Sequence, residues 1–210
     1  MKVENMKYLL FIVLLVAVIL TAGCVSENKK TVITPTQTTT VPTIVVTTTS
    51  SPSLQNFNGQ GIVFDYPSSL SVASSLQQMR SIMQSQGVEL ITVLRSSDDS
   101  LTLQVGRQQN PATIDSLYND KRGVADTVNS QGMTLMGEKF VKYSVSKTTL
   151  PKQGILVIGY ARKDNGQTGI SYWQLHGGYE YAVIFIYPNA QRADSGQALR
   201  NTIIDSIHIT

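Results

Sequence analysis

The sequence predicts an α+β fold, an α/β/α sandwich in which helices cover both faces of a mainly antiparallel sheet. From Asn56 onward, segments with the two-residue periodicity of strands alternate with segments of helical periodicity. In the second half, the predicted strands follow one another through short turns, which join strands antiparallel. Two of these strands, at residues 155–162 and 179–187, contain the stretches ILVIGYA and YEYAVIFIY, which are apolar on both faces, so both faces of the sheet must be covered.

The first half of this domain is predicted to hold four strands, at residues 61–67, 70–73, 88–95 and 101–107. A helix lies between the second and third strands. Ser75 and Gln78 have the spacing of a capping box at its start, and Gly87 ends it. The turn at residues 96–100 contains Asp98 and Asp99, and two adjacent carboxylates do not make a calcium site.

A second helix is predicted from Thr113 to Gly132. Its apolar stripe has helical spacing and also takes in Lys121. Asp120, Lys121 and Arg122 are expected to form a mostly solvated face.

The second half continues with strands at residues 134–149, 155–162, 170–176 and 179–187. A tight turn is expected at residues 164–166, and Gly177-Gly178 make the next turn. Asp194 and Gln197 are expected to cap a last helix. Ile207 and Ile209 alternate near the C-terminus and predict a short final strand.

The stretch GIVFDYPSSLSV at residues 61–72 resembles the opening of PsbP-like domains, in which a strand that ends in Phe-x-Tyr-Pro leads into a short strand. The chain also ends in IIDSIHI after a terminal helix, as these domains do. Leu70 departs from the pattern, since family members often have tryptophan there. The resemblance implies an α/β/α fold around an antiparallel sheet. It carries over neither a site residue nor the role of the plant members, which help photosystem II to retain its inorganic ions.

The N-terminus predicts a lipoprotein signal at residues 1–23. Lys2 and Lys7 precede an uncharged apolar run of 15 residues, which suits a secretory signal better than a membrane span of about 20 residues. Small residues then lead to Cys24, the single cysteine, in an arrangement that resembles a lipobox with Thr21 in place of the usual leucine. Cys24 is therefore the expected lipidation site, which ties the chain to the lipid bilayer outside the cytoplasm. The alternative is an uncleaved transmembrane anchor.

Residues 24–55 are predicted to be a disordered stalk, and residues 56–210 the PsbP-like globular domain. Ten of the twenty residues from 31 to 50 are threonine, with prolines between them, and such a segment buries too little apolar surface to fold. Its composition is also typical of O-glycosylated stalks. Without a second cysteine the domain has no internal disulfide.

Charge and motifs exclude several function classes. Of the net charge of +3, the six charged residues near the N-terminus contribute +2, so the remaining chain is near neutral and nucleic acid is not an expected partner. No catalytic motif, metal-ligand spacing or cofactor loop is recognisable, so catalytic residues, metal and cofactors are all predicted as none. His176 and His208 are read as structural or solvated residues.

Aromatic residues gather in the last three long strands, with Arg162 and Lys163 beside a turn. Core packing explains most of these rings, and Trp173 is expected to be buried. Arg162, Lys163 and Tyr172 are the candidate contacts for a partner, an envelope protein or a glycan. The sequence thus favours a membrane-tethered extracytoplasmic lipoprotein with a non-catalytic binding or accessory domain. The alternatives are a structural component of the cell envelope or an enzyme with an unrecognised site.

Overall fold

The computed structural model describes residues 53–131, 133–135, 138–148, 154–161 and 167–210. The predicted signal, Cys24 and almost all of the predicted stalk lie outside these residues. The first strand, β1 (Leu54–Gly59), starts two residues before the expected domain start at Asn56. The sequence did not predict β1, because its residues are mostly polar and mostly exposed.

The main sheet has eight strands, and every neighbouring pair is antiparallel. Its order is β3 (Leu70–Val72), β4 (Glu89–Ser96), β5 (Thr102–Gln109), β10 (Tyr179–Tyr187), β9 (Thr168–His176), β8 (Gly154–Ala161), β7 (Glu138–Thr148) and β6 (Met133–Leu135). The β9–β10 turn is made by Gly177 and Gly178, with φ values of 57° and 78°. Two consecutive positive φ angles are what a tight hairpin turn requires, so the glycine pair acts as the sequence predicted.

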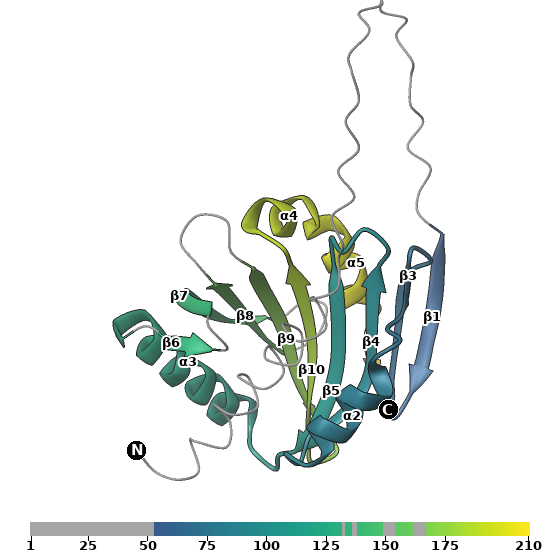
Figure 1. The fold of residues 1–210 in the computed structure, drawn as a ribbon. Coiled ribbons are helices and arrows are strands. Elements are labelled where there is room, and N and C mark those ends of the chain that lie inside the picture. The colour runs from purple at the N-terminus through teal and green to yellow at the C-terminus, as the bar shows by residue number, and fades with distance from the viewer. Residues whose placement is uncertain (1–52, 132, 136–137, 149–153, 162–166) are drawn as a thin grey trace, which may run out of the picture.

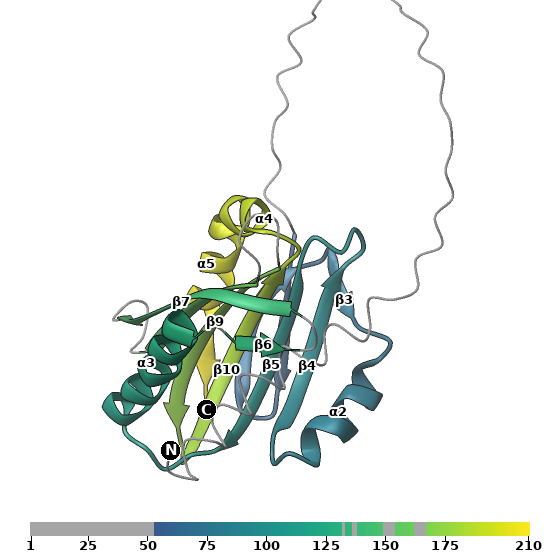
Figure 2. The same ribbon diagram turned by 60° about the vertical axis from the view of Figure 1, so that its left-hand side comes forward.

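Helices α2 (Leu76–Gln84) and α3 (Ile114–Gln131) cover one face of this sheet. Figure 2 shows that the two helices cover different parts of the same face, with α2 against β4 and α3 against β7 and β8. Met79 and Met83 from α2 join Leu117, Ala125 and Val128 from α3 in one buried cluster with strand residues. The apolar stripe predicted for α3 is therefore its packing face, whereas α2 buries Met79 and Met83 but leaves Ile82 exposed.

The other face is covered by helices α4 (Ala190–Ser195) and α5 (Gln197–Ser206) and by a small second sheet. That sheet has the order β1, β2 (Ile62–Pro67), β11 (His208–Ile209). Phe64 of β2 is fully buried and stacks on Phe57 of β1, with 5.0 Å between ring centroids. The fold is the predicted sandwich with an antiparallel sheet and helices on both faces, and the predicted final strand is present as β11.

Strand β4 contains a bulge, because its register with β5 shifts between Leu90 and Thr92. Leu90 and Val93 belong to the core cluster under α2 and α3, whereas Ile91 and Leu94 belong to the cluster on the opposite face. Residues three apart share a face of a strand only if one residue is extra. The bulge therefore exchanges the faces of the strand midway along its length.

Two predicted helix caps are wrong. Ser75 makes no capping hydrogen bond to α2, and its hydroxyl instead donates to the sulfur of Met79 at 3.3 Å. The final helical region begins earlier than predicted, at α4, where the side chain of Asn189 accepts a hydrogen bond from the Arg192 amide. Gly196 separates α4 from α5, and Asp194 lies inside α4 rather than at a cap.

Among the helices that the structure describes, none combines the length and the apolar character that crossing a bilayer demands.

Candidate functional site

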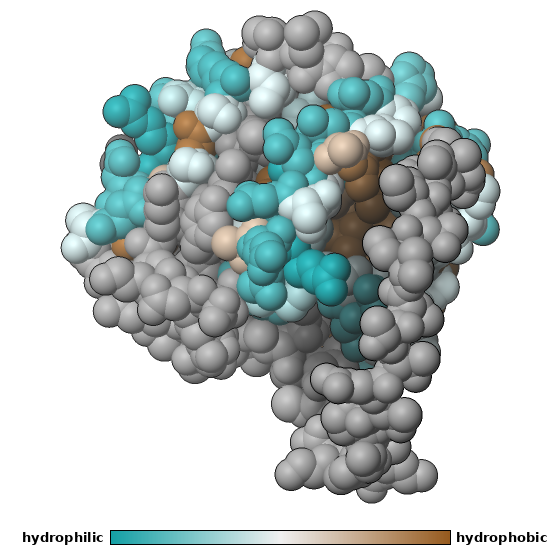
Figure 3. Space-filling model, turned by 90° about the horizontal axis from the view of Figure 1, so that it is seen from above, coloured by the Kyte–Doolittle hydropathy of each residue, from teal (hydrophilic) through white to brown (hydrophobic). Residues whose placement is uncertain are grey.

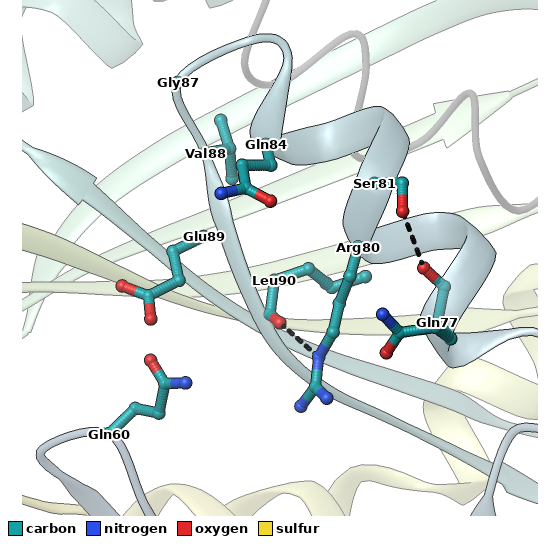
Figure 4. A pocket seen from close by; sticks show the side chains of 9 residues that line it. All are labelled: Gln60, Gln77, Arg80, Ser81, Gln84, Gly87, Val88, Glu89 and Leu90. Atoms are coloured by element: carbon teal, nitrogen blue, oxygen red, sulfur yellow. Dashed lines mark hydrogen bonds between the residues drawn. The ribbon is translucent and has the colours of Figure 1, made fainter.

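An open polar pocket lies between helix α2, the start of β4 and the turn that joins β1 to β2 (Figure 4). Its volume is about 510 Å³. The helix contributes Gln77, Arg80, Ser81 and Gln84, which recur at intervals of three and four residues and so share one helix face. The remaining lining residues are Gln60 from the turn and residues 87–90. This α2 pocket has mostly polar walls.

Arg80 closes the inner wall of the α2 pocket. Its Nε donates to the carbonyl oxygen of Leu90 at 3.0 Å, and one terminal nitrogen donates to the carbonyl of Ile91. These are the carbonyls at the bulge of β4, so Arg80 ties the helix to the irregular part of the strand. A guanidinium has five N–H donors, and these two bonds leave donors free for another partner.

The charge of Arg80 is not neutralised within the described part of the chain, where no carboxylate lies within ion-pair distance of it. Glu89 belongs to the same pocket but pairs with Arg107, with 2.6 Å between Glu89 Oε2 and Arg107 Nε. The hydrogen bond to Glu89 raises the pKa of Arg107 above its ordinary value. The pocket therefore contains a fixed positive charge that Glu89 does not cancel.

Arg107 also fixes the turn that forms the outer rim of the pocket. It donates to the carbonyl of Gln60 at 2.9 Å and to the Tyr181 hydroxyl at 3.3 Å, and it lies 4.8 Å from the centre of the Tyr179 ring. Gln60 and Gly61 both have positive φ angles, 54° and 78°. A Cβ at Gly61 would lie 2.9 Å from the Tyr181 oxygen, so glycine is required there.

A second hollow, of about 480 Å³, lies between residues 71–75 and residues 95–99. It also contains an arginine, Arg95, whose Nε lies 3.9 Å from the carboxylate of Asp99. Arg95 already has an acidic partner, so the second hollow attracts an anion less strongly than the α2 pocket does.

A buried charged cluster joins helix α3 to the sheet. Lys121 is 1% exposed, and its Nζ lies 3.5 Å from Glu180 Oε1 and 3.6 Å from the centre of the Trp173 ring. Glu180 is fully buried and accepts hydrogen bonds from Gln108, at 2.8 Å, and from Asn110. Burial lowers the pKa of Lys121, and Glu180 opposes this shift. The prediction of a solvated face is wrong for Lys121, and the cluster is closed to solvent.

The residues named as sites from the sequence do not come together in the described structure. Cys24, Arg162 and Lys163 lie outside the described residues. Tyr172 is 2% exposed and packs in the core cluster beneath α5, so its ring is not available to a partner at the surface. Trp173 is 1% exposed, which confirms its predicted burial.

The histidines and acids offer no centre of chemistry among the described residues. His176 and His208 are both exposed. Within the described ranges, no three His, Cys, Asp or Glu side chains lie close enough to hold a metal ion.

The described part of the chain exposes few large apolar side chains. Figure 3, a view from the end at which α4 lies, shows mostly hydrophilic residues around one hollow with apolar side chains. The large apolar residues that are exposed in the described chain, Leu54, Val72 and Ile82, come from three different elements. None of them lines the α2 pocket.

Sequence reasoning did not identify the α2 pocket. One signal was present, because residues 77, 80, 81 and 84 give α2 a wholly polar face. Such a face is usually only solvated, and what makes it a pocket wall is the turn at Gln60, about 17–24 positions earlier in the chain.

Comparison with known proteins yields likenesses of structure only. No protein-family model matches the sequence, and no curated protein matches it. The solution structure of cyanobacterial PsbP (CyanoP) from Synechocystis sp. PCC 6803 matches with a TM-score of 0.47 and 14% identity, over 78% of this chain and 96% of that one. The crystal structure of the Saccharomyces cerevisiae Ran-binding protein Mog1p matches with a TM-score of 0.47 and 12% identity, over 76% of this chain and 96% of that one. A PsbP structure is thus among the solved structures that this chain is similar to, in line with the resemblance in its sequence.

Proposed function

We propose that this chain is an extracytoplasmic lipoprotein whose folded domain is a non-catalytic binding or accessory module. The observation that carries the proposal is the α2 pocket, with its polar walls and its uncompensated arginine. The pocket supplies a place to bind, and the N-terminal sequence supplies a means to hold the domain at a membrane. An envelope protein or a glycan is the partner expected at such a surface.

Catalysis is a poorer fit to the α2 pocket than binding. Ser81 has the one hydroxyl among its lining residues, and this hydroxyl donates to the main-chain carbonyl of Gln77 at 3.2 Å. A serine nucleophile needs an adjacent base, and no described hydrogen bond joins Ser81 to a histidine or a carboxylate. Glu89, the acid of the pocket, is held by Arg107.

The position of the pocket suits a tethered domain. The described chain enters β1 at Leu54, and the α2 pocket lies beside the opposite end of that strand, at Gln60 (Figure 1). Six residues of strand separate the two points by about 20 Å. A lipid at Cys24 and a stalk that joins at Leu54 would place the pocket on the side of the domain away from its attachment.

Anchoring is tested by changing Cys24 to Ser. We expect the wild-type chain in the membrane fraction, with an intact mass that matches a lipid-modified chain beginning at Cys24. The C24S chain should be released or should remain as an uncleaved precursor. Thr21→Leu, which restores the usual lipobox residue, is the matched control and should be processed as the wild type is. A mature chain that begins at Met1 and has a free thiol would contradict the lipoprotein proposal.

Binding is tested with a photo-crosslinking residue placed on α2. At Gln84, in the pocket wall, it should yield a defined adduct in isolated membranes. At Gln78, an exposed residue of the same helix outside the pocket, it should not. Equal adducts at both positions, or adducts at neither, would count against the pocket as the binding surface.

A further inference from the structure

We infer that the α2 pocket binds an acidic sugar, a hydroxyl-rich ring that carries a carboxylate, such as a uronate. The inference rests on the proposed binding function and names the class of ligand. Three features of the pocket support it: one uncompensated positive charge, two amide side chains that make no described hydrogen bond, and a volume suited to a small polar molecule.

The positive charge of Arg80 favours a ligand that carries one carboxylate. Arg80 uses two of its donors on the bulge carbonyls, and no described carboxylate pairs with it. Glu89 is already paired with Arg107, so the charge at Arg80 attracts an anion from outside. The planar guanidinium matches a carboxylate in geometry, and charge-assisted bonds of this kind are about twice as strong as neutral ones.

The amide side chains that line the pocket favour a ligand with hydroxyl groups. Gln77 and Gln84 lie on the exposed face of α2, and no described hydrogen bond uses their side chains. Gln60 reaches the same pocket from the opposite wall, and Figure 4 shows its amide facing Glu89 across the opening. The amide oxygen of Gln60 accepts from Arg107 at 3.5 Å, which leaves its NH₂ group as the donor for a ligand. A primary amide both donates and accepts, as a hydroxyl does, so these three side chains suit neighbouring hydroxyls on a sugar ring.

The size of the pocket favours a small molecule over a long polymer surface. A volume of about 510 Å³ lies within the range of roughly 300–1,000 Å³ typical of small-molecule sites. Such sites usually have mainly apolar walls, whereas this one is mostly polar, which disfavours an apolar ligand. Its opening to solvent allows one or two sugar rings to enter while a longer glycan continues outside.

The test is a calorimetric titration of the full chain, purified from membranes in detergent, with four probes. These are digalacturonate, its neutral methyl ester, inorganic phosphate and a short glutamate peptide. Digalacturonate should bind, and the ester should bind about tenfold more weakly or worse, since it cannot form the charge-assisted bond to Arg80. The double variant Gln77→Ala with Gln84→Ala should lose about fivefold or more in affinity for digalacturonate, the effect of one or two neutral hydrogen bonds.

Gln78→Ala is the matched control, because Gln78 is exposed on the same helix but does not line the pocket. It should bind digalacturonate as the wild type does. Binding of the ester, phosphate or glutamate peptide as tight as that of digalacturonate would overturn the sugar assignment and leave a binding role for the pocket. If no probe binds, the acidic-sugar assignment is wrong. The crosslinks formed at Gln84 and the intact mass of the chain processed at Cys24 then test the proposed function separately.

Discussion

The helical spacing of α3 places Lys121 in the apolar stripe, yet its charge predicts a solvated side chain, and the structure buries it. The apolar stripe of α3 has Leu117 four residues before it and Ala125 four residues after it, so the helical periodicity alone points Lys121 at the core. Its charge suggested a solvated position, because a lysine is rarely buried unless it is paired. The pairing partner, Glu180, lies 59 residues later in a strand and was not predictable from spacing.

Removing the charge of Glu180 should destabilise the domain strongly. Glu180→Gln leaves the buried Lys121 ammonium without its carboxylate, and breaking a buried pair in this way costs about 3–5 kcal/mol. The measurement is urea unfolding followed by the fluorescence of Trp173, which is the single tryptophan and contacts Lys121.

Arg122→Met is the matched control for this prediction. Arg122 is the next residue on α3, its side chain is 63% exposed, and its ion pair with Asp126 at 3.9 Å lies at the surface. Its loss should change the free energy of unfolding by no more than about 0.5 kcal/mol. If the two substitutions lowered the free energy of unfolding equally, the buried Lys121–Glu180 pair would stabilise the domain no more than a surface ion pair does.

The pKa of the Asp98 carboxyl should show whether the turn between β4 and β5 has the hydrogen bonds described here. Hydrogen bonds from Ser100 and Ser96 lower the pKa of Asp98 from 3.8 to about 2. Because the folded value lies below the unfolded one, the ionised group stabilises the turn at pH above 3.8, and this contribution is lost as the pH falls through about 2. A carbon-detected NMR titration of the Asp98 carboxyl checks it, and a midpoint near 3.8 would contradict the hydrogen bonds. Ser100→Ala should move the midpoint upward.

At the scale of an element, β4 departs from what alternation alone predicts. The sequence correctly placed this strand, but it gave no sign of the extra residue, because every residue from Leu90 to Leu94 except Thr92 is apolar. A strand that is apolar on both faces contains no pattern from which a change of face can be read. The bulge is fixed by a tertiary contact, the bonds from Arg80 to the carbonyls of Leu90 and Ile91.

Two strand glycines should respond differently to the same substitution. A Cβ at Gly154 of β8 would lie 2.6 Å from the ring of Tyr172 and 2.8 Å from the Trp173 carbonyl. Gly154→Ala should therefore destabilise the domain by about 1–3 kcal/mol through overpacking. Gly169→Ala in β9 meets nothing within 4 Å and should be near neutral, and thermal unfolding compares the two. Equal melting temperatures would mean that β8 can move away from Tyr172 without loss.

At the scale of the molecule, the architecture was predictable and the candidate site was not. Periodicity revealed the long strands and the packing face of α3, because each is a property of neighbouring residues. Strand β1 was missed because it buries little apolar surface. The α2 pocket is formed where α2, β4 and the turn at Gln60 meet, and no local pattern records such a meeting.

Removing the last four residues should loosen the domain as a whole. Residues 207–210 contain Ile207, which is 2% exposed, and the strand β11, and the Thr210 amide bonds to the Gly61 carbonyl at 2.9 Å. A chain that ends at Ser206 should lose about 2–5 kcal/mol, the usual effect of losing a buried isoleucine. Its affinity for ligands of the α2 pocket should also fall, because Gln60 adjoins Gly61. Thr210→Ala, an exposed change at the chain end that keeps the main-chain bond to Gly61, is the control and should melt as the wild type does.

The small sheet also determines how the domain responds to tension. A pull on the chain at Leu54, directed away from the domain, acts along β1, whose six residues are all paired with β2. Hydrogen bonds between antiparallel strands run perpendicular to the strands, so this force loads the whole row in shear rather than peeling off one bond at a time. If the proposed stalk pulls on the domain, all of these bonds would resist together, and the bond from Arg107 to Gln60 at the far end of β1 would hold the rim of the α2 pocket in place under load.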